Sequence, residues 1–301
     1  MRIVFFGTPE FASHSLEHLI KAGKNIVAVV TAPDKPAGRG MNLQQSAVKQ
    51  VALKYAIPVL QPEKLKNPDF LNQLKSYQAE LQLVIAFRML PEVVWNMPPL
   101  GTMNLHASLL PDYRGAAPIN WAIINGEKVT GVSTFFLKHE IDTGDILLRK
   151  EFQIGDEMDA GELHDCLMKL GAEAILESVE MIEKGQTKGE PQGDDSRKIA
   201  PKIFKETCQI DFSKSAIEVY NFIRGMSPYP AAWFLFHGKP MKVLKAKLVN
   251  FENQLNAGDI QIESGNRILV KCKDQCLELL EIQPESKKRM KTEDFLRGWR
   301  P

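Results

Sequence analysis

The chain lacks several features that would place it in a specialised class of protein. It has four cysteines, Cys166, Cys208, Cys272 and Cys276, at no metal-ligand spacing, which argues against a zinc site or a disulfide framework. Lys plus Arg total 38 and Asp plus Glu total 37, which excludes the class of uniformly basic proteins that coat nucleic acids. It contains no run of the ~18–20 apolar residues of a membrane-spanning helix, and we expect no signal peptide, because the apolar residues 3–6 follow Met1 and Arg2 directly. We therefore expect a cytoplasmic protein that requires no metal.

The first half of the chain has the pattern of a parallel sheet. Short apolar runs alternate with helical patterns, which predicts a Rossmann-like α/β fold with ligands at the carboxyl ends of its strands. Near-continuous apolar sequence suits strands that are covered on both faces. The expected strands are residues 3–6, 26–30, 58–60 and 81–86, and the expected helices are residues 9–21, 46–55 and 68–78.

Glycine is scarce where a dinucleotide-binding fold would need it. The turn after the first expected strand contains Gly7 alone and then Pro9, which has no N–H to donate. A pyrophosphate site requires several glycines for close backbone approach. The layout is Rossmann-like, but we do not expect a nicotinamide or flavin cofactor.

The second half of the chain predicts a different domain. A long helix is expected over residues 159–184, and a polar, Gly-rich connection follows it. Beyond it, five short strands with close turn signals predict a small OB-like β-barrel, at residues 231–236, 241–248, 259–262, 267–271 and 276–282. We predict a first domain at 1–190, a basic linker at 191–207 and a C-terminal domain at 208–301.

The most informative polar residues follow another expected strand. Asn104 and His106 are two residues apart, so an extended backbone points both side chains to one side. An amide donor and a titratable ring suit attack of an amine on a carbonyl, whose oxygen becomes negative. The structural alternative is that Asn104 caps a turn and His106 is a satisfied core histidine.

A carboxylate is a candidate partner for this histidine. Asp142 lies in a Gly-containing turn between two expected strands, at residues 131–137 and 146–154. Near His106 it would orient the ring and stabilise its protonated form. It could instead be an Asx-turn residue, and spacing alone does not decide between the two.

These segments resemble a known family. Residues 104–106, 108–111 and 142–145 are similar to the formyltransferases that use 10-formyltetrahydrofolate. Residues 6–12, 33–40, 114–118 and 280–284 narrow the resemblance to members that formylate methionine on initiator tRNA for translation initiation. The resemblance implies a catalytic trio of Asn104, His106 and Asp142, a folate co-substrate, and no metal. It implies that a loop of four residues binds the folate: Ser108, Leu109, Leu110 and Pro111.

The resemblance also implies a nucleic-acid partner, initiator methionyl-tRNA, bound by a monomer. Lys35 and Arg39 lie in a connection at residues 31–45 that is long and rich in Pro and Gly, which predicts irregular structure. Arg39 matches an arginine that the family places against the tRNA acceptor end. The remaining predicted tRNA contacts are Lys202, Lys205, Lys287, Lys288 and Arg289. The alternative is that these charges are only a solvated surface.

Two other functions compete with this interpretation. One is a 10-formyltetrahydrofolate-dependent enzyme for a small amine, either a nucleotide sugar or glycinamide ribonucleotide. The other is a non-catalytic RNA-binding protein, which the intact trio disfavours. The chain also departs from the family at Arg88, where a glycine is common, and folate contacts there are expected to differ.

Overall fold

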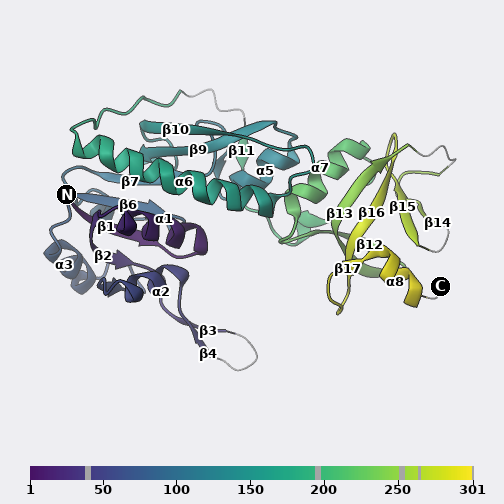
Figure 1. Cartoon of the computed structure of the whole chain (residues 1–301), viewed down its shortest axis with the longest axis horizontal. Coiled ribbons are helices and arrows are strands. Elements are labelled where there is room, and N and C mark those ends of the chain that lie inside the picture. Colours follow the sequence, from purple (N-terminus) through teal and green to yellow (C-terminus); the bar gives the residue numbers. More distant parts are fainter. Residues whose placement is uncertain (38–41, 194–197, 251–254, 264–265, 300–301) are drawn as a thin grey trace. The chain divides into compact units, whose positions relative to one another are not determined.

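The computed structural model describes residues 1–37, 42–193, 198–250, 255–263 and 266–299, and these form two compact units (Figure 1). No helix among these residues is long and apolar enough to cross a membrane. Both units are discontinuous in sequence, and the predicted continuous boundaries at 190 and 207 stay a prediction. The N-terminal unit comprises Met1–Arg114, Gly131–Phe152 and Asp165–Lys198, and the C-terminal unit comprises Gly115–Thr130, Gln153–His164 and Ile199–Pro301.

A seven-stranded sheet forms the centre of the N-terminal unit. Its order is β10-β9-β7-β6-β1-β2-β5. The pairs β1·β2, β1·β6, β2·β5 and β6·β7 are parallel, whereas β7·β9 is antiparallel. The strands are β1 (Arg2–Gly7), β2 (Asn25–Val30), β5 (Val59–Leu60), β6 (Leu81–Ile85), β7 (Thr102–His106), β9 (Val129–Phe136) and β10 (Ile146–Gln153). The predicted Rossmann-like parallel sheet is therefore confirmed.

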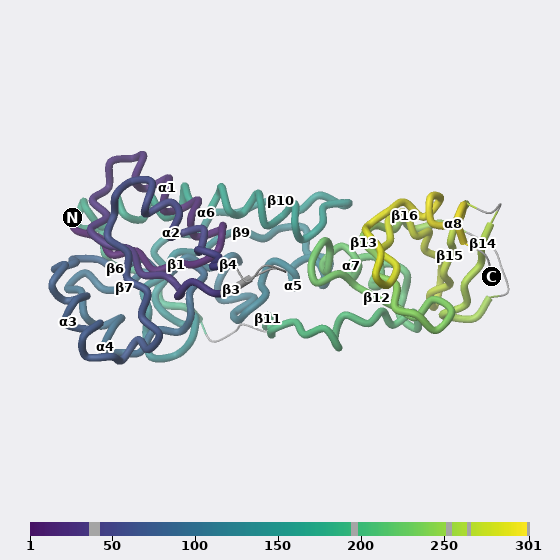
Figure 2. The backbone as a smooth tube through the Cα atoms, turned by 90° about the horizontal axis from the view of Figure 1, so that it is seen from below, coloured from purple at the N-terminus to yellow at the C-terminus, as the bar shows by residue number. Residues whose placement is uncertain are grey.

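Helices cover both faces of this sheet, which explains why its strands are apolar throughout. In Figure 2, α1, α2 and α6 lie on one side of β1, β6 and β7, and α3 and α4 lie on the other. Every residue of β6 is buried, as a strand covered on both faces requires. The helices are α1 (Glu10–Lys21), α2 (Ala47–Lys54), α3 (Pro68–Ser76), α4 (Glu92–Trp95) and α6 (Ala160–Glu183).

The long connection after β2 contains regular structure where irregular backbone was predicted. β3 (Lys35–Ala37) and β4 (Asn42–Gln44) pair as an antiparallel hairpin. At its base, Lys49 Nζ lies 2.5 Å from Asp34 Oδ2, and Gln61 Nε2 donates to Asp34 Oδ1 at 2.8 Å. Hydrogen bonds from Lys49 and Gln61 lower the pKa of Asp34. The hairpin is thus anchored by side chains from α2 and the segment after β5, contacts that local sequence does not reveal.

An antiparallel sheet forms the centre of the C-terminal unit, as predicted. Its path is β12-β13-β16-β15-β14, and β17 pairs with β16. Register shifts near Lys245 mark irregularities in β13, which bend a strand and increase its twist. The strands are β12 (Ala232–Phe236), β13 (Lys239–Val249), β14 (Ile260–Glu263), β15 (Arg267–Lys271), β16 (Cys276–Pro284) and β17 (Met290–Lys291).

One face of this sheet packs on a core with two helices. Phe234, Val243, Leu279 and Ile282 are buried there with Ile223 of α7 (Ala216–Met226) and Leu296 of α8 (Thr292–Gly298). The elements outside the two large sheets are α5 (Pro118–Ile124), α7 (Ala216–Met226), α8 (Thr292–Gly298), the two-stranded pair β8 (Arg114–Gly115) and β11 (Ile199–Ala200), and a 3₁₀ turn at Glu206–Cys208.

Two helix starts show how local sequence determines local structure. At the start of α6, Asp159 Oδ1 accepts from the N–H of Glu162 while Glu162 Oε2 accepts from the N–H of Asp159, which is a reciprocal cap. Similarly, α7 starts at Ala216, behind a capping box in which Ser215 and Glu218 satisfy each other's backbone N–H groups.

Candidate active site

The polar pair on β7 lies where the parallel strands end. Asn104 pairs with Val84 of β6 and with Phe135 of β9, so it occupies the middle of the sheet near its carboxyl edge. His106 is the last residue of the strand and is 7% exposed, whereas Asn104 is half-buried. The side-chain amide of Asn104 forms no hydrogen bond with any residue that the structure describes. It is therefore available to a ligand.

The histidine ring is held by a backbone carbonyl. His106 Nε2 lies 2.9 Å from the carbonyl oxygen of Tyr113. A carbonyl can only accept, so Nε2 carries the proton and Nδ1 of the neutral ring is an acceptor. Tyr113 has φ 61°, an uncommon backbone conformation for a bulky residue and one that clusters at functional sites. This contact leaves Nδ1 as the ring nitrogen available for chemistry.

Asp142 approaches that free nitrogen. Its Oδ2 lies 3.9 Å from His106 Nδ1, and the two side chains are 13% and 8% exposed. Asp142 has φ 56°, a left-handed conformation that aspartate tolerates better than most residues. The distance is too long for a direct hydrogen bond but short for a charge interaction in a largely buried site. The structure thus brings together two predicted site residues from separate elements.

Hydrogen bonds from the segment after α6 hold the Asp142 turn in place. Gln192 Nε2 donates to the carbonyl of Gly144 at 2.7 Å, and Arg114 Nη2 donates to Gln192 Oε1 at 2.7 Å. Glu190 and Ile146 exchange two backbone hydrogen bonds beside it. Gly144 also lies so close to the carbonyl of Phe136 that a Cβ would clash. These contacts restrict the position of the turn relative to the sheet.

The loop after His106 is fixed mainly by its own polar groups. Ser108 donates to the carbonyl of Asp112 at 2.7 Å, and Ser133 joins the carbonyl of Ser108 to the N–H of Leu110. Ser108 is fully buried and Leu110 is 1% exposed. Of the four residues predicted to bind folate, only Leu109 and Pro111 are partly exposed. Side-chain contact with a ligand is therefore available to those two.

A pocket of about 450 Å³ borders the Asp142 turn within the N-terminal unit. Glu140 and Thr143 line it on either side of Asp142, and the Trp95 ring packs edge-on against His139 at 5.4 Å between centroids. The three trio residues are not among its lining residues. The full lining is Trp95, Arg114, Leu137, Lys138, His139, Glu140, Thr143 and Gln192.

Arg88 has a structural partner. Its guanidinium donates to the carbonyls of Glu63 and Pro62, and it lies over the ring of Phe87, with 5.7 Å between Cζ and the centroid. The Phe87 ring in turn packs edge-on against Phe6 of β1. Arg88 thus ties the segment after β6 to the segment after β5, a role that a glycine lacks.

The predicted tRNA contacts lie in both units. Lys35 is exposed on β3, and Arg39 lies outside the described residues. Lys202 and Lys205 are exposed in the segment before the 3₁₀ turn, and Lys202 Nζ lies 5.3 Å from the ring centroid of Phe204. Lys287 and Lys288 are exposed between β16 and β17.

Arg289 differs from its lysine neighbours. Its guanidinium forms an ion pair and a hydrogen bond with Glu281 of β16. Its charge is therefore already compensated within the C-terminal unit, which makes it a weaker candidate for a phosphate contact.

Sequence reasoning missed the residues that position the site. The Tyr113 carbonyl, Ser133, Arg114 and Gln192 all act through contacts distant in sequence or through the backbone. No spacing signal marks such residues. A backbone carbonyl is present at every position, and the side-chain contacts join segments that are far apart in the sequence. Among the described residues, no group of three or more His, Cys, Asp or Glu side chains could hold a metal ion.

Comparisons with known proteins identify the family of this chain. Residues 1–179 match the family described as formyl transferase, and residues 202–300 match the formyl transferase C-terminal domain. The chain is 49% identical to a methionyl-tRNA formyltransferase of Bacteroides fragilis, over 99% of this chain and 95% of that one. It is 50% identical to that of Parabacteroides distasonis, over 100% of this chain and 96% of that one.

Solved structures share the fold at low identity. An N-formyltransferase from Helicobacter canadensis, in complex with folinic acid and dTDP-3-aminofucose, gives a TM-score of 0.68 at 18% identity, covering 96% of this chain and 99% of that one. HypX from Aquifex aeolicus, in complex with tetrahydrofolic acid, gives 0.66 at 19% identity, over 98% of this chain and 47% of that one. This chain belongs to the formyltransferase family, and within that family its whole length aligns with the methionyl-tRNA formyltransferases.

Proposed function

We infer that this chain transfers the formyl group of 10-formyltetrahydrofolate to the α-amino group of methionine on initiator methionyl-tRNA, for translation initiation. The observation that carries this inference is 49–50% identity, over 99–100% of the chain, to proteins named methionyl-tRNA formyltransferase. The small-amine formyltransferases share the fold at under 20% identity, which supports the scaffold alone. We propose that the enzyme works in the cytoplasm as a monomer.

We propose that Asn104 stabilises the charge that develops on the formyl oxygen. Its amide lies at the carboxyl edge of a parallel sheet, where such folds bind ligands. When the amine attacks the formyl carbon, that oxygen gains negative charge and accepts a stronger hydrogen bond than before. One such donor contributes about 10²–10³ in rate.

We propose that His106 accepts the proton from the attacking amine through Nδ1. The Tyr113 carbonyl occupies Nε2–H, so Nδ1 is the nitrogen with a free lone pair. The Asp142 carboxylate, 3.9 Å from Nδ1, would stabilise the imidazolium that forms. Proton transfer by a positioned side chain is worth about 10²–10⁴ in rate.

Folate binding is proposed at the loop after β7 and the neighbouring pocket. The interior hydrogen bonds of Ser108 and Ser133 hold the loop rigid, while Leu109 and Pro111 keep exposed surface for an apolar ring. The lining of the pocket combines the apolar side chains of Trp95 and Leu137 with polar ones such as Gln192. The proposed tRNA contacts are the exposed Lys35, Lys202, Lys205, Lys287 and Lys288, together with Arg39, and to a lesser degree Arg289.

The decisive experiment supplies 10-formyltetrahydrofolate with four acceptors: initiator methionyl-tRNA, elongator methionyl-tRNA, an amino sugar nucleotide and glycinamide ribonucleotide. We expect formylation of the initiator methionyl-tRNA and at least about tenfold less of the elongator. Formylation of a small amine without reaction on tRNA would refute the proposed activity on initiator methionyl-tRNA. Binding of tRNA without any transfer would support the non-catalytic alternative instead.

A further inference from the structure

A pocket of about 820 Å³ lies wholly within the C-terminal unit. Its size is within the ~300–1,000 Å³ typical of small-molecule sites. Three lysines, Lys202, Lys205 and Lys242, line it together with the aromatic residues Trp233 and Tyr229. Two glutamates also line it, so the lysines leave a net positive charge. Its chemistry combines a ring surface with cations.

The floor of the pocket is a row of side chains across three strands. Trp233 of β12 pairs with Lys242 of β13, and Lys242 pairs with Gln283 of β16. Their neighbours Phe234 and Val243 are buried in the core, so alternation places the row on the other face of the sheet, and Trp233 also packs against the edge of that core cluster. Trp233, Lys242 and Gln283 are all partly exposed. The sheet therefore presents an aromatic, a cationic and an amide group side by side.

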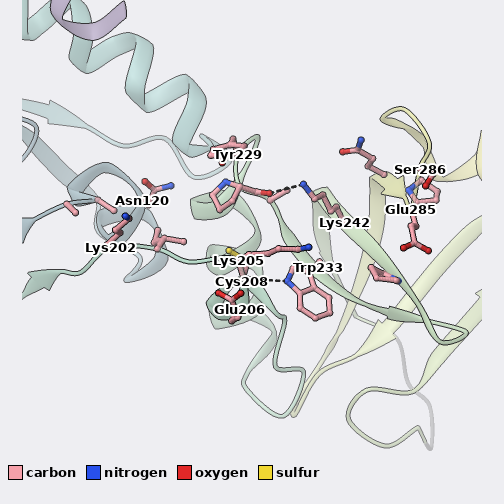
Figure 3. A pocket seen from close by; sticks show the side chains of 18 residues that line it. Asn120, Lys202, Lys205, Glu206, Cys208, Tyr229, Trp233, Lys242, Glu285 and Ser286 are labelled. Atoms are coloured by element: carbon pink, nitrogen blue, oxygen red, sulfur yellow. Dashed lines mark hydrogen bonds between the residues drawn. The ribbon is translucent and has the colours of Figure 1, made fainter. Parts of the chain in front are cut away.

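Two irregular segments form the walls of this pocket. In Figure 3 the side chain of Lys205 extends across the pocket beside the ring of Trp233. The indole N–H of Trp233 donates to the carbonyl of Lys205 at 3.1 Å, which fixes the ring against this wall. On the other wall Tyr229 is 83% exposed. The ring of Trp233 is thus positioned before any ligand binds.

The polar groups of the pocket retain unused hydrogen-bonding capacity. The Lys242 ammonium donates to the carbonyl of Pro230 at 3.1 Å and has further hydrogens to donate. The Lys205 ammonium forms no hydrogen bond within the described residues. Gln283 Nε2 donates to the carbonyl of Lys287 at 3.0 Å, which orients its Oε1 as an open acceptor. A ligand that fits must offer an anion, a flat ring and a donor.

We propose that this pocket is a nucleotide subsite for an unpaired residue of a bound RNA. The base stacks on Trp233, the phosphate lies between the ammonium groups of Lys205 and Lys242, and an exocyclic amino group of the base donates to Gln283 Oε1. Stacking on an aromatic side chain with a cation at the backbone is how single-stranded nucleic acids bind without base pairing. The identity of the RNA as tRNA rests on the proposed function, whereas the chemistry of the pocket does not.

Substitutions at Trp233 test the stacking contact. Trp233→Leu removes the ring and the indole hydrogen bond, while Trp233→Phe keeps a smaller aromatic ring and removes the hydrogen bond. We expect Trp233→Leu to weaken initiator tRNA binding at least about tenfold and Trp233→Phe by no more than about threefold. Equal losses would assign the effect to the hydrogen bond with Lys205, and no loss in either would remove Trp233 from the site. Both outcomes overturn the stacking proposal.

A matched lysine separates the pocket from general surface charge. Lys245 is exposed on the same strand as Lys242 but does not line the pocket. We expect Lys205→Gln and Lys242→Gln each to reduce the slope of log K against log salt by about one, and Lys245→Gln to leave it nearly unchanged. Three equal slopes would overturn the phosphate position.

Short RNAs test the base contact independently of catalysis. Wild-type protein is titrated with the hexanucleotides C₆ and U₆, and tryptophan fluorescence is followed. We expect tighter binding of C₆, quenching that Trp233→Phe abolishes, and loss of the C₆ preference in Gln283→Ala. Equal binding of C₆ and U₆ in the wild type would overturn the Gln283 contact.

The two inferences fail in distinguishable ways. A wild-type enzyme that does not formylate methionyl-tRNA refutes the proposed function, and the hexanucleotide titrations still test the pocket. If the wild type formylates tRNA but the Trp233 variants keep its KM for tRNA, the pocket proposal alone is overturned. Pocket variants should raise KM and leave kcat nearly unchanged, since they lie outside the proposed catalytic trio.

Discussion

The two sheets of this chain place polar residues in different positions. In the N-terminal sheet, β6 is buried on both faces and polar side chains gather where the strands end, as at His106. In the C-terminal sheet, one face packs on a core while the other carries Lys242 and Gln283. A parallel sheet covered by helices exposes only its edges, whereas a sheet covered on one side offers a whole face. The first suits a focused reaction site and the second suits an extended binding surface.

The largest expected effect tests the edge of the N-terminal sheet. Asn104→Ala should lower kcat about 10²–10³-fold with little change in tRNA affinity, because it removes a donor to the developing charge. The measurement is steady-state formylation together with direct tRNA binding. Asn72→Ala, at an exposed position on α3, is the matched control and should behave as wild type. An unchanged kcat for Asn104→Ala would remove this residue from the mechanism.

The second effect concerns the stability of the C-terminal sheet. The carboxylate of Glu278 on β16 is 9% exposed and bridges Arg267 Nη2 at 2.6 Å and Lys247 Nζ at 3.1 Å. Glu278→Gln removes the carboxylate from Lys247 and leaves Arg267 with Glu263 as its ion-pair partner, at 2.9 Å, so we expect a loss of about 1–2 kcal/mol in the free energy of unfolding. Urea denaturation monitored in the C-terminal unit measures it. A loss below ~0.3 kcal/mol would show that the ion pairs contribute nothing net.

The pH dependence of the same residue has a defined sign. Burial raises the pKa of Glu278, but the hydrogen bonds from Arg267 and Lys247 outweigh burial and lower it overall. A lowered folded-state pKa adds stability above the unfolded value of ~4.3, and that stability is lost as pH falls through the folded value. The stability difference between wild type and Glu278→Gln should therefore shrink in acid.

The third effect concerns the charged turn beyond β16. Lys287→Gln combined with Lys288→Gln should reduce the salt-dependence slope of tRNA binding by about two and weaken binding several-fold. Arg289→Gln should change the slope much less, because Glu281 already compensates its charge. The measurement is tRNA affinity at several salt concentrations. An equal change from Arg289→Gln would show that its ion pair opens on binding.

The smallest effect lies on the helical cover of the N-terminal sheet. Hydrogen bonds from Lys54 of α2 and Lys21 lower the pKa of Glu17 to about 2. Because the partner lysines are well exposed, we expect Glu17→Gln to cost no more than ~1 kcal/mol of unfolding free energy. This contribution is present above pH ~4.5 and is lost as pH falls toward 2. Acid titration of both proteins by circular dichroism checks the window.

Much of the architecture is predictable because it depends on neighbouring residues. The apolar run of β6 and the reciprocal cap of Asp159 and Glu162 are read directly from spacing. The hairpin of β3 and β4 is not, because it is anchored by Lys49 and Gln61 from later segments. Likewise, Asp274 Oδ1 accepts a hydrogen bond from the N–H of Ala216 at the start of α7, a contact between residues 58 positions apart.

The sequence by itself determined the alternation of strands and helices, the polar pair on β7 and the presence of an acidic turn further along the chain. Only the tertiary structure decided that Asp142 reaches His106, because that requires the antiparallel pairing of β7 with β9. It also decided which ring nitrogen of His106 is free, through the carbonyl of Tyr113. Side-chain spacing is encoded locally, whereas the partner of a buried group depends on which distant segments the sheet brings together.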